Sequence, residues 1–300
     1  MARVAVVIPT RDRPQELAPC LQSILAGSEQ DFEVWFIDQS SRDDTARAFE
    51  PFRGDPRLHH VPSATRGNCA ARNEGTSRST APIVVHTDDD CRPRADWLAQ
   101  HLAEFEADAT LGVVCGQVRV PQELLRPGAE AASFYPREAV FEGRLPPAWH
   151  WGITANLAVR RSVLDRVGPF DEVLGAGGRL RSGGDADWVR RATAVTRVKH
   201  SPKPEVIHLG VRYDEDARQL MLRYDYGLGA ALLKGVRSGD LRVLRQAASI
   251  LGTLSLGVLS RAIRLRRPLG ARRVLSMMAG AWAAARTPLS ADRRTFADPE

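Results

Sequence analysis

Apolar residues in the first third of the chain gather in short, nearly continuous runs. Residues 3–9 (RVAVVIP) are apolar almost throughout rather than at every second position, which is typical of a strand buried on both faces of a parallel sheet. Similar runs predict strands at residues 32–37, 58–61 and 83–87.

Amphipathic segments separate these predicted strands. Leu17, Leu21 and Ile24 repeat at helical spacing after Pro14, which suits the first position of a helix. Ser41, with Asp44 three residues later, resembles a capping box and predicts a second helix. A third is expected at residues 69–76. Because strands and helices alternate, we expect right-handed crossovers and an α/β fold, a mostly parallel sheet with helices on both faces.

The second half of the chain is less regular. Strands are predicted at residues 113–118 and 156–160, and a short helix is expected from Ser162. Residues 175–184 contain five glycines in ten positions, which predicts a mobile or tightly turned loop. A further helix is predicted to start at Asp185.

The C-terminal region has a different pattern. Asp240 is suited to cap a helix with apolar residues at Leu244, Ala248, Leu251 and Leu254. Residues 241–286 contain nine arginines and no acidic residue. The uncharged stretch 246–260 is shorter than the roughly 20 residues of a membrane-spanning helix.

Two interpretations of this region remain open. Interleaved arginines and short apolar runs favour interfacial helices on an anionic membrane surface. The alternative is helices that pack on the rest of the protein or on a second subunit. Nucleic acid is disfavoured as a partner, because Trp282 is the only aromatic residue of this basic segment available for base stacking.

Composition places the chain among ordinary soluble globular proteins. Of its 300 residues 43% are hydrophobic and 26% charged, and the net charge is +6. The four cysteines (Cys20, Cys69, Cys91 and Cys115) show neither zinc-site spacing nor a disulfide framework. The first residues lead directly into a predicted strand without a signal-peptide pattern, so we expect a cytoplasmic protein.

Carboxylates follow two of the predicted strands. Asp38 ends the strand at 32–37, and Asp88, Asp89 and Asp90 follow the strand at 83–87. Ligands of parallel sheets bind beyond the carboxyl ends of the strands. A Mg²⁺ or Mn²⁺ held there by one or two carboxylates keeps positions free for substrate phosphates. The alternative is an acidic cap for the helix expected around Trp97.

Several segments together resemble the family 2 glycosyltransferases of the GT-A fold. They read VVIPTRDRPQELAPCLQSIL, FIDQSSRDDT, RGNCAARNEG, VVHTDDDC, TANLAVRRSVLDRVGPFDE and GGDADWVRR, and they cover roughly residues 3–210 in the family's order. The resemblance implies a GT-A-type, Rossmann-like catalytic domain at residues 1–215, followed by a helical, arginine-rich region at 216–300. It also implies an inverting, metal-dependent transferase that moves a sugar from a nucleotide diphosphate to an acceptor hydroxyl.

The resemblance assigns roles to individual residues. For donor binding it implies Thr10, Arg11, Asp38, Arg72, Asn73, Asp88 and Asp89. For the metal, Mg²⁺ or Mn²⁺, it implies Asp88, Asp90 and His208. On the acceptor side it implies Trp149, Trp151 and Asn156. A saccharide or lipid-linked acceptor in cell-surface polysaccharide or glycolipid synthesis, on the inner face of the membrane, would suit such an enzyme.

The catalytic base is expected at the start of the helix that follows the glycine-rich loop. The family's segment usually reads Glu-Asp-x-Asp, and here Gly184 takes the place of the glutamate. Asp185 is the predicted base and Asp187 the alternative, since a carboxylate can accept the proton of the attacking hydroxyl. Because of Gly184, an inactive sugar-nucleotide-binding or scaffold protein is one alternative function. A sugar nucleotidyltransferase is another, since such enzymes also place aspartates and a metal against nucleotide phosphates.

Overall fold

The computed structural model describes residues 2–147, 150–265 and 270–297. Its main sheet has the strand order β3-β2-β1-β4-β9-β6-β10-β5, with β8 paired to β10, and a small second sheet pairs β11 with β7. The strands are β1 (Val4–Thr10), β2 (Phe32–Asp38), β3 (Leu58–Pro62), β4 (Ile83–His86), β5 (Cys91–Pro93), β6 (Leu111–Arg119), β7 (Ala129–Glu130), β8 (Ala139–Phe141), β9 (Leu157–Arg160), β10 (Arg197–His208) and β11 (Arg212–Tyr213).

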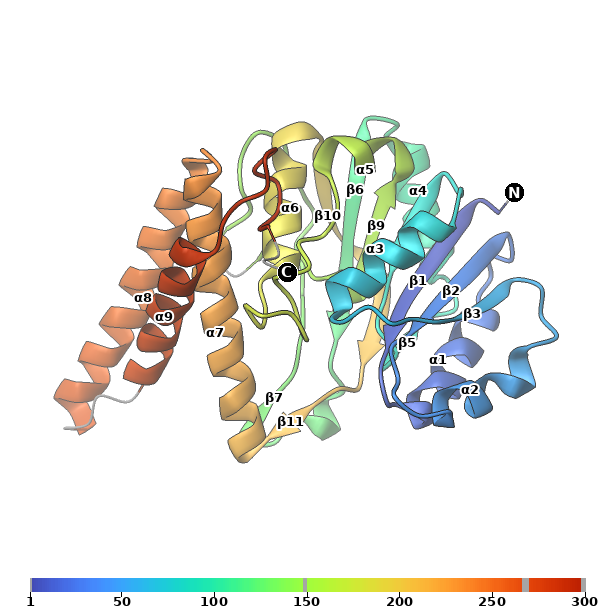
Figure 1. Ribbon diagram of the computed structural model, residues 1–300, viewed down its shortest axis with the longest axis horizontal. Coiled ribbons are helices and arrows are strands. Elements are labelled where there is room, and N and C mark those ends of the chain that lie inside the picture. The colour runs from blue at the N-terminus through green and yellow to red at the C-terminus, as the bar shows by residue number, and fades with distance from the viewer. Residues whose placement is uncertain (1, 148–149, 266–269, 298–300) are drawn as a thin grey trace.

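Helices pack on both faces of the sheet and extend to one side of it (Figure 1). They are α1 (Pro14–Leu25), α2 (Asp44–Phe49), α3 (Asn68–Arg78), α4 (Trp97–Ala107), α5 (Arg161–Val167), α6 (Gly184–Val195), α7 (Asp214–Arg237), α8 (Arg242–Leu265) and α9 (Ala271–Arg286), with short 3₁₀ turns at Glu50–Phe52, Gln122–Leu124 and Thr154–Asn156.

Most of the long strands run in one direction. Strands β1, β2, β3 and β4 form parallel pairs, and β6 is parallel to β10, whereas β9 runs antiparallel between β4 and β6. The parallel strands β1 and β4 are buried along their whole length, as their continuous apolar sequence predicts. The predicted mostly parallel α/β sheet is confirmed, and its carboxyl edge brings the ends of β1, β2, β4 and β10 together.

The predicted capping box at Ser41 does not form. Helix α2 begins at Asp44 with Asp43 as its cap residue, and the Ser41 hydroxyl and backbone N–H donate instead to Asp12 Oδ1. Asp12 has a left-handed backbone (φ 55°), and it accepts these bonds from the turn after β2. The loop after β1 is therefore fastened to the loop after β2.

Helix α7 joins the sheet to the C-terminal helices. It begins at Asp214, so the boundary predicted at residues 215/216 falls within its first turn. It packs against α6 on one side and against α9 on the other. A side-chain carbon at Gly280 would overlap the backbone of Tyr226, so only glycine allows α9 to approach α7 this closely. Two hydrogen bonds of 2.7 and 2.9 Å from Arg273 to Asp225 add to this contact.

A buried ion cluster ties α7 to α6. The Lys234 ammonium lies 2.6 Å from Asp171 Oδ2 and 2.7 Å from Asp187 Oδ2, and all three side chains are fully buried. Arg190 and Arg191 complete the surroundings of Asp187 at 2.9 and 3.0 Å. Burial opposes ionisation of Asp187, but these three cations hold its pKa far below the usual range. The carboxylate therefore stays charged and acts as the centre of the α6–α7 contact.

This cluster generates a stability prediction. Lys234→Met leaves Asp171 and Asp187 buried with one cation fewer, and loss of one partner of a buried ion pair costs about 3–5 kcal/mol. We expect the free energy of unfolding, measured by urea denaturation, to fall by about that amount. Arg53→Met is the control, because Arg53 and its partner Glu50 are both exposed, and it should change stability by about 0.5 kcal/mol or less. Equal stability of the two variants would contradict the structural role of the cluster.

Candidate functional site

The polar groups predicted from the sequence meet at the carboxyl edge of the main sheet. Thr10 and Asp38 are the last residues of β1 and β2, the three aspartates follow β4, and His208 is the last residue of β10. Helix α4 has Asp96 as its cap residue, and β5 separates it from the aspartates. The aspartates are therefore not a cap for that helix.

Two arginines offset part of the negative charge of the three aspartates. Arg13 Nη1 donates to Asp89 Oδ1 at 3.0 Å and to Asp90 Oδ2 at 2.9 Å. Arg72, whose side chain is 1% exposed, donates to Asp88 Oδ1. Such charge-assisted bonds to a carboxylate are the geometry that arginine also offers to a phosphate. The cluster thus combines metal-binding carboxylates with two cations able to contact a diphosphate.

Asp89 differs from its neighbours. It is buried and accepts a 2.7 Å hydrogen bond from the Thr10 hydroxyl. Burial, aided by the charge of Asp90 and opposed by Arg13 and the Thr10 bond, raises the pKa of Asp89 to about 6. Its carboxyl therefore holds the end of β1 against the cluster.

A group that could hold a metal ion lies beside these contacts. One ligand atom each of Asp88, Asp90, Cys91 and His208 lies within 4.8 Å of the others, and His208 Nε2 is 3.3 Å from Asp90 Oδ1. Within the part of the chain that the structure describes, the buried Asp90 Oδ1 and His208 Nδ1 have no hydrogen-bond partner. Burial, with Asp88 and Asp90 nearby, raises the pKa of the Cys91 thiol far above its usual range, so it stays protonated. Two carboxylates and one imidazole fit a hard divalent cation such as Mn²⁺.

Asp38 forms a second polar pair at this edge. Its Oδ2 lies 2.8 Å from His60 Nε2, and its Oδ1 accepts the Ser40 backbone N–H at 2.9 Å. Burial opposes ionisation, but these bonds outweigh it and lower the pKa of Asp38. A carboxylate fixed in this way can accept hydrogen bonds from a nucleoside.

Asp185 lies in the first turn of α6, close enough to the aspartate cluster for the charges of Arg72 and Asp88 to affect its pKa. Its Oδ1 accepts a 3.0 Å hydrogen bond from the Thr154 hydroxyl. The pKa of Asp185 is raised, chiefly by burial. The charge of Asp88 adds to this rise, whereas the charge of Arg72 and the hydrogen bond from Thr154 oppose it. A helix N-terminus favours the ionised form of a carboxylate, but at Asp185 burial outweighs this effect. A carboxylate with a raised pKa is a stronger proton acceptor than an exposed aspartate.

The glycine-rich loop is tightly turned and packed. Leu180 N–H donates to Val173 O at 2.8 Å, closing the loop on itself. A side-chain carbon at Gly184 would lie 2.6 Å from Cys69 Sγ, so a glutamate does not fit there without rearrangement of α3. The neighbours of residue 184 therefore leave room for glycine but not for a larger side chain. Asp185 is the next residue after this closely packed turn.

Two other predicted polar residues are engaged within the fold. Asp187 lies in the buried ion cluster of α6 and α7, with both of its carboxylate oxygens bound to cations. The Asn73 amide donates to Phe170 O at 2.9 Å and accepts the Phe170 N–H at 2.9 Å. Asn73 therefore holds α3 against the loop after α5 rather than facing the aspartates.

The predicted acceptor-side residues are mostly internal. Asn156 is fully buried, accepts hydrogen bonds from Trp97 and His101, and donates to two backbone carbonyls. Trp151 packs with apolar residues of α7, α8 and α9. Trp149 lies outside the described residues.

Three residues of the site escaped the sequence analysis. Arg11 is exposed and pairs with Asp12, whereas Arg13, after the left-handed turn at Asp12, reaches the aspartates. His60 lies in the strand predicted at residues 58–61, but the sequence does not predict its contact with Asp38. Tyr224 lies on α7, and burial together with the charges of Asp185, Glu130 and Asp88 raises its pKa. The sequence carries no local signal for these residues, since each depends on a contact between distant elements.

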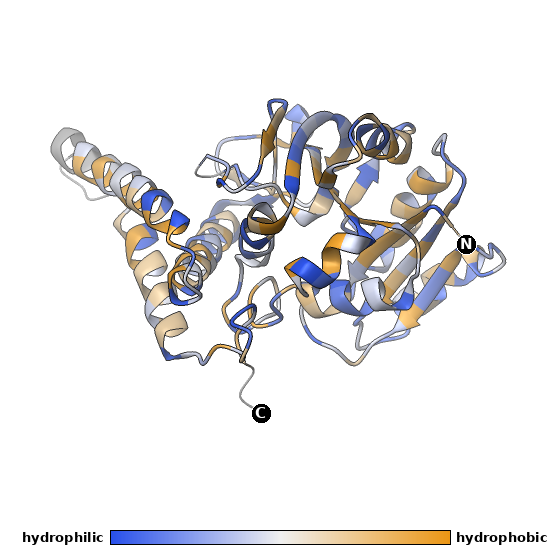
Figure 2. Cartoon of the chain, turned by 90° about the horizontal axis from the view of Figure 1, so that it is seen from above, coloured by the Kyte–Doolittle hydropathy of each residue, from blue (hydrophilic) through white to orange (hydrophobic). Residues whose placement is uncertain are grey.

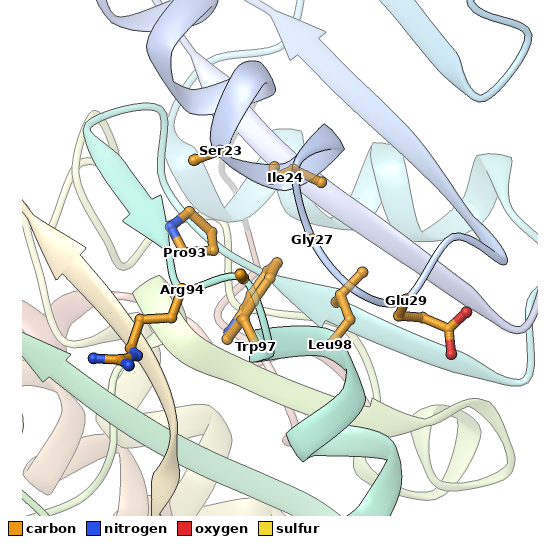
Figure 3. A pocket seen from close by; sticks show the side chains of 9 residues that line it. Ser23, Ile24, Gly27, Glu29, Pro93, Arg94, Trp97 and Leu98 are labelled. Carbon is orange, nitrogen blue, oxygen red and sulfur yellow. The ribbon is translucent and has the colours of Figure 1, made fainter.

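A separate small hollow lies between the end of α1 and the β5–α4 turn (Figure 3). Ile24, Gly27, Pro93 and Trp97 line it, and its volume of about 10 Å³ admits at most one water molecule. The Arg94 side chain points away from it. This hollow is too small to hold a nucleotide.

Comparisons with known proteins identify the family of the chain. The model of "Glycosyl transferase family 2" matches residues 5–168. The glycosyltransferase AglE of Haloferax volcanii is 29% identical over 203 residues, which are 63% of this chain and 61% of AglE. An uncharacterized glycosyltransferase of Nostoc sp. is 22% identical over 179 residues, 57% of this chain and 55% of that protein. The matches thus span 55–61% of the length of these two relatives.

Solved structures share the fold. The mannosyltransferase PcManGT from Pyrobaculum calidifontis, in complex with GDP-Man and Mn²⁺, gives a TM-score of 0.63 at 19% identity, covering 95% of this chain and 87% of PcManGT. TarS 1–349 of S. aureus gives 0.59 at 15% identity, covering 97% of this chain and 95% of TarS 1–349. The likeness in structure establishes a GT-A-type architecture. The family model matches more than half of the length of this chain, and the chain therefore belongs to glycosyl transferase family 2.

Proposed function

We propose that this protein transfers a sugar from a nucleotide-diphosphate sugar to an acceptor hydroxyl, with inversion at the anomeric carbon. The observation that carries the proposal is the meeting of the aspartate cluster, its two arginines and Asp185 at one edge of the sheet. PcManGT is described with GDP-Man, and another TarS structure with UDP-GlcNAc. Both are donors of the proposed class.

The donor would lie across the carboxyl ends of β1, β2 and β4. Asp38, held by His60 and Ser40, would accept hydrogen bonds from the base or ribose. Arg13 and Arg72 would exchange part of their carboxylate contacts for the diphosphate, which offers oxygens of the same charge. With the nucleoside at Asp38, the diphosphate would lie at the sheet edge where Arg13 and Arg72 offset its negative charge.

Asp88, Asp90 and His208 would hold Mg²⁺ or Mn²⁺. The cluster fits such a cation because its oxygen ligands converge and one buried carboxylate oxygen lacks a hydrogen bond among the described residues. When bound, the cation would offset the negative charge of the departing diphosphate. Gly210 leaves space beside Asp90 and His208, because a side-chain carbon there would overlap Asp90 Oδ2 and lie 3.0 Å from His208 Cε1.

Asp185 would be the general base. It is the carboxylate of the α6 turn that remains outside the buried ion cluster, and its hydrogen bond from Thr154 fixes one of its oxygens. The other oxygen can then accept the acceptor's proton as the hydroxyl attacks. Asp187, held by three cations with a strongly lowered pKa, is a poor proton acceptor.

The setting proposed for this reaction is cell-surface polysaccharide or glycolipid synthesis at the cytoplasmic side of the membrane. The acceptor would be a saccharide or a lipid-linked saccharide. Free nucleoside diphosphate as product distinguishes this reaction from nucleotidyl transfer, which releases pyrophosphate. Donor binding without turnover over a broad acceptor panel would instead indicate a binding protein.

The first prediction concerns the base. Asp185→Asn should lower the rate of sugar transfer by about 10²–10⁴, the usual contribution of a general base, while nucleotide-sugar binding measured by calorimetry stays near the wild-type value. Asp187→Asn is the matched comparison, and its main effect should be a lower melting temperature, because it weakens the α6–α7 cluster. Near-normal transfer by folded Asp185→Asn would show that this carboxylate is not the base.

The second prediction concerns pH. Asp185 must be deprotonated to accept a proton, so kcat/KM should fall as the pH falls through its pKa. Thr154→Val removes a hydrogen bond that favours the ionised form, and it should therefore move this acidic limb to higher pH. Thr154→Ser keeps the hydroxyl and should leave the limb in place. If the acidic limb of the kcat/KM profile of Thr154→Val stays at the wild-type pH or moves to lower pH, Asp185 is not the group that titrates there.

The third prediction concerns the cation. Gly210→Ala should push Asp90 and His208 out of place and weaken Mn²⁺ binding, measured by titration without donor, by about tenfold or more. Gly54→Ala is the control, since nothing lies within 4 Å of the added carbon. Unchanged Mn²⁺ affinity in a folded Gly210→Ala variant would count against a site formed by Asp90 and His208.

A further inference from the structure

The C-terminal helices expose an unusual amount of apolar surface. Twelve large hydrophobic side chains are exposed among the described residues, and eight of them belong to this region. They are Leu241, Leu244, Leu251, Leu256, Leu259, Leu275, Met278 and Trp282. We call these eight residues the C-terminal apolar face. Figure 2 shows the helices that carry them standing apart from the sheet.

Helical spacing gathers these residues along the outer sides of the two helices. On α9, Leu275, Met278 and Trp282 follow one another at intervals of three and four, so they share one side of the helix. The opposite side of α9 is buried against α7 through Met277 and Ala284. The apolar face is therefore surface left over after the helices have packed on the protein.

The charge around this face is positive. Residues 241–286 contain nine arginines and no acidic residue. Arg242 and Arg273 are paired with Asp240 and Asp225 of neighbouring segments. Arg245 and Arg272 are exposed and form no ion pair within 4.0 Å among the described residues, although the charge of Arg272 contributes to lowering the pKa of Glu215. The Arg286 guanidinium lies over the ring of Trp282, which brings charge directly to the apolar surface.

We propose that the C-terminal apolar face docks on the surface of an anionic lipid bilayer. Exposed leucines and a tryptophan next to unpaired arginines match the two parts of such a surface, its acyl chains and its negative headgroups. A second copy of the chain is a poorer occupant, since residues 241–286 carry nine arginines and no acidic residue, so that two such faces would bring like charges together.

The helix α8 lies on the bilayer rather than across it. By length and composition, Arg242–Ser260 is apolar enough to cross a membrane, and 17% of that window is buried within the described residues. Its first half is fixed to the protein, however, because Val243 and Ile250 are buried and Gln246 donates to Pro146 O. The ten residues from Leu251 to Ser260 span about 15 Å at about 1.5 Å per residue. That is about half of the roughly 30 Å hydrocarbon core.

Docking would place the candidate active site near the bilayer. Helix α9 packs on α7, and α7 packs on α6, whose first turn carries Asp185. Resting on the proposed function, this arrangement would present the base to a lipid-linked acceptor. Membrane binding itself needs neither donor nor turnover, so its test stands apart from that of the transferase activity.

The test is sedimentation of the full-length protein with vesicles in the absence of donor and metal. The protein should sediment with vesicles that contain phosphatidylglycerol and remain in solution with pure phosphatidylcholine vesicles. Raising the salt concentration should weaken binding, because exposed charges are screened over about 10 Å at 0.1 M salt. Leu256→Ser/Leu259→Ser should lower the partition coefficient on the order of tenfold or more, since each leucine loses its burial in lipid.

Matched variants separate the face from general effects. Arg245→Gln/Arg272→Gln should weaken binding by about fivefold per arginine, which corresponds to about 1 kcal/mol per basic residue at an anionic surface. Arg47→Gln/Arg53→Gln removes the same charge from the α2 region, and Leu125→Ser removes an exposed leucine elsewhere. These controls should bind within about twofold of the wild type. Melting temperatures confirm that each variant is folded.

Three results would overturn the proposal. The first is full-length protein that ignores phosphatidylglycerol vesicles at low salt. The second is equal loss of binding in the face variants and in the controls. The third is lipid-independent dimerisation, detected by analytical ultracentrifugation, that Leu256→Ser/Leu259→Ser abolishes; this would assign the face to a second copy of the chain.

Discussion

Three adjacent carboxylates at the end of β4 repel one another, and the fold supplies counter-charges from distant parts of the chain. Arg13 comes from the loop after β1 and Arg72 from α3, and together they contact all three aspartates. The cluster can release these contacts only in exchange for another charge balance. In the proposed function a divalent cation and a diphosphate would provide one, because the cation would bind the carboxylates and the phosphates would bind the arginines. The local structure therefore depends on the acidic cluster, and so would the proposed donor binding.

Helix α7 connects this edge to the rest of the molecule. The buried Lys234 fixes it to Asp187, two residues after Asp185, while the close contact at Gly280 fixes it to α9. The position of the proposed base is thus set by a packed helix rather than by a free loop. The same helix carries Tyr224, whose pKa is raised by burial and by the charges of Asp185 and Asp88. The C-terminal helices are in this sense a part of the site's support as well as a surface of their own.

Much of the sheet could be predicted from the sequence, because buried parallel strands are continuous apolar runs and because motif order fixes which strand ends meet. The position of Asp88 and Asp90 at this edge follows from the same rule, whereas His208 is implied only by the family resemblance, since no strand is predicted before it. Side-chain direction could not be predicted. Arg13 rather than Arg11 turns inward because Asp12 has a left-handed backbone, and Asn156 is internal because buried groups surround it. Both outcomes depend on contacts between segments that are far apart in sequence.

The central claim is that the carboxyl edge of the sheet holds a divalent cation together with the donor's diphosphate. Anomalous diffraction at the manganese edge, from crystals grown with Mn²⁺ and a nucleoside diphosphate, tests it most directly. We expect an anomalous peak that locates a manganese ion coordinated by Asp90, His208 and oxygens of the diphosphate. Arg13 or Arg72 should contact the phosphates. A manganese peak elsewhere, or a diphosphate bound away from Asp88 and Asp90, would contradict the account.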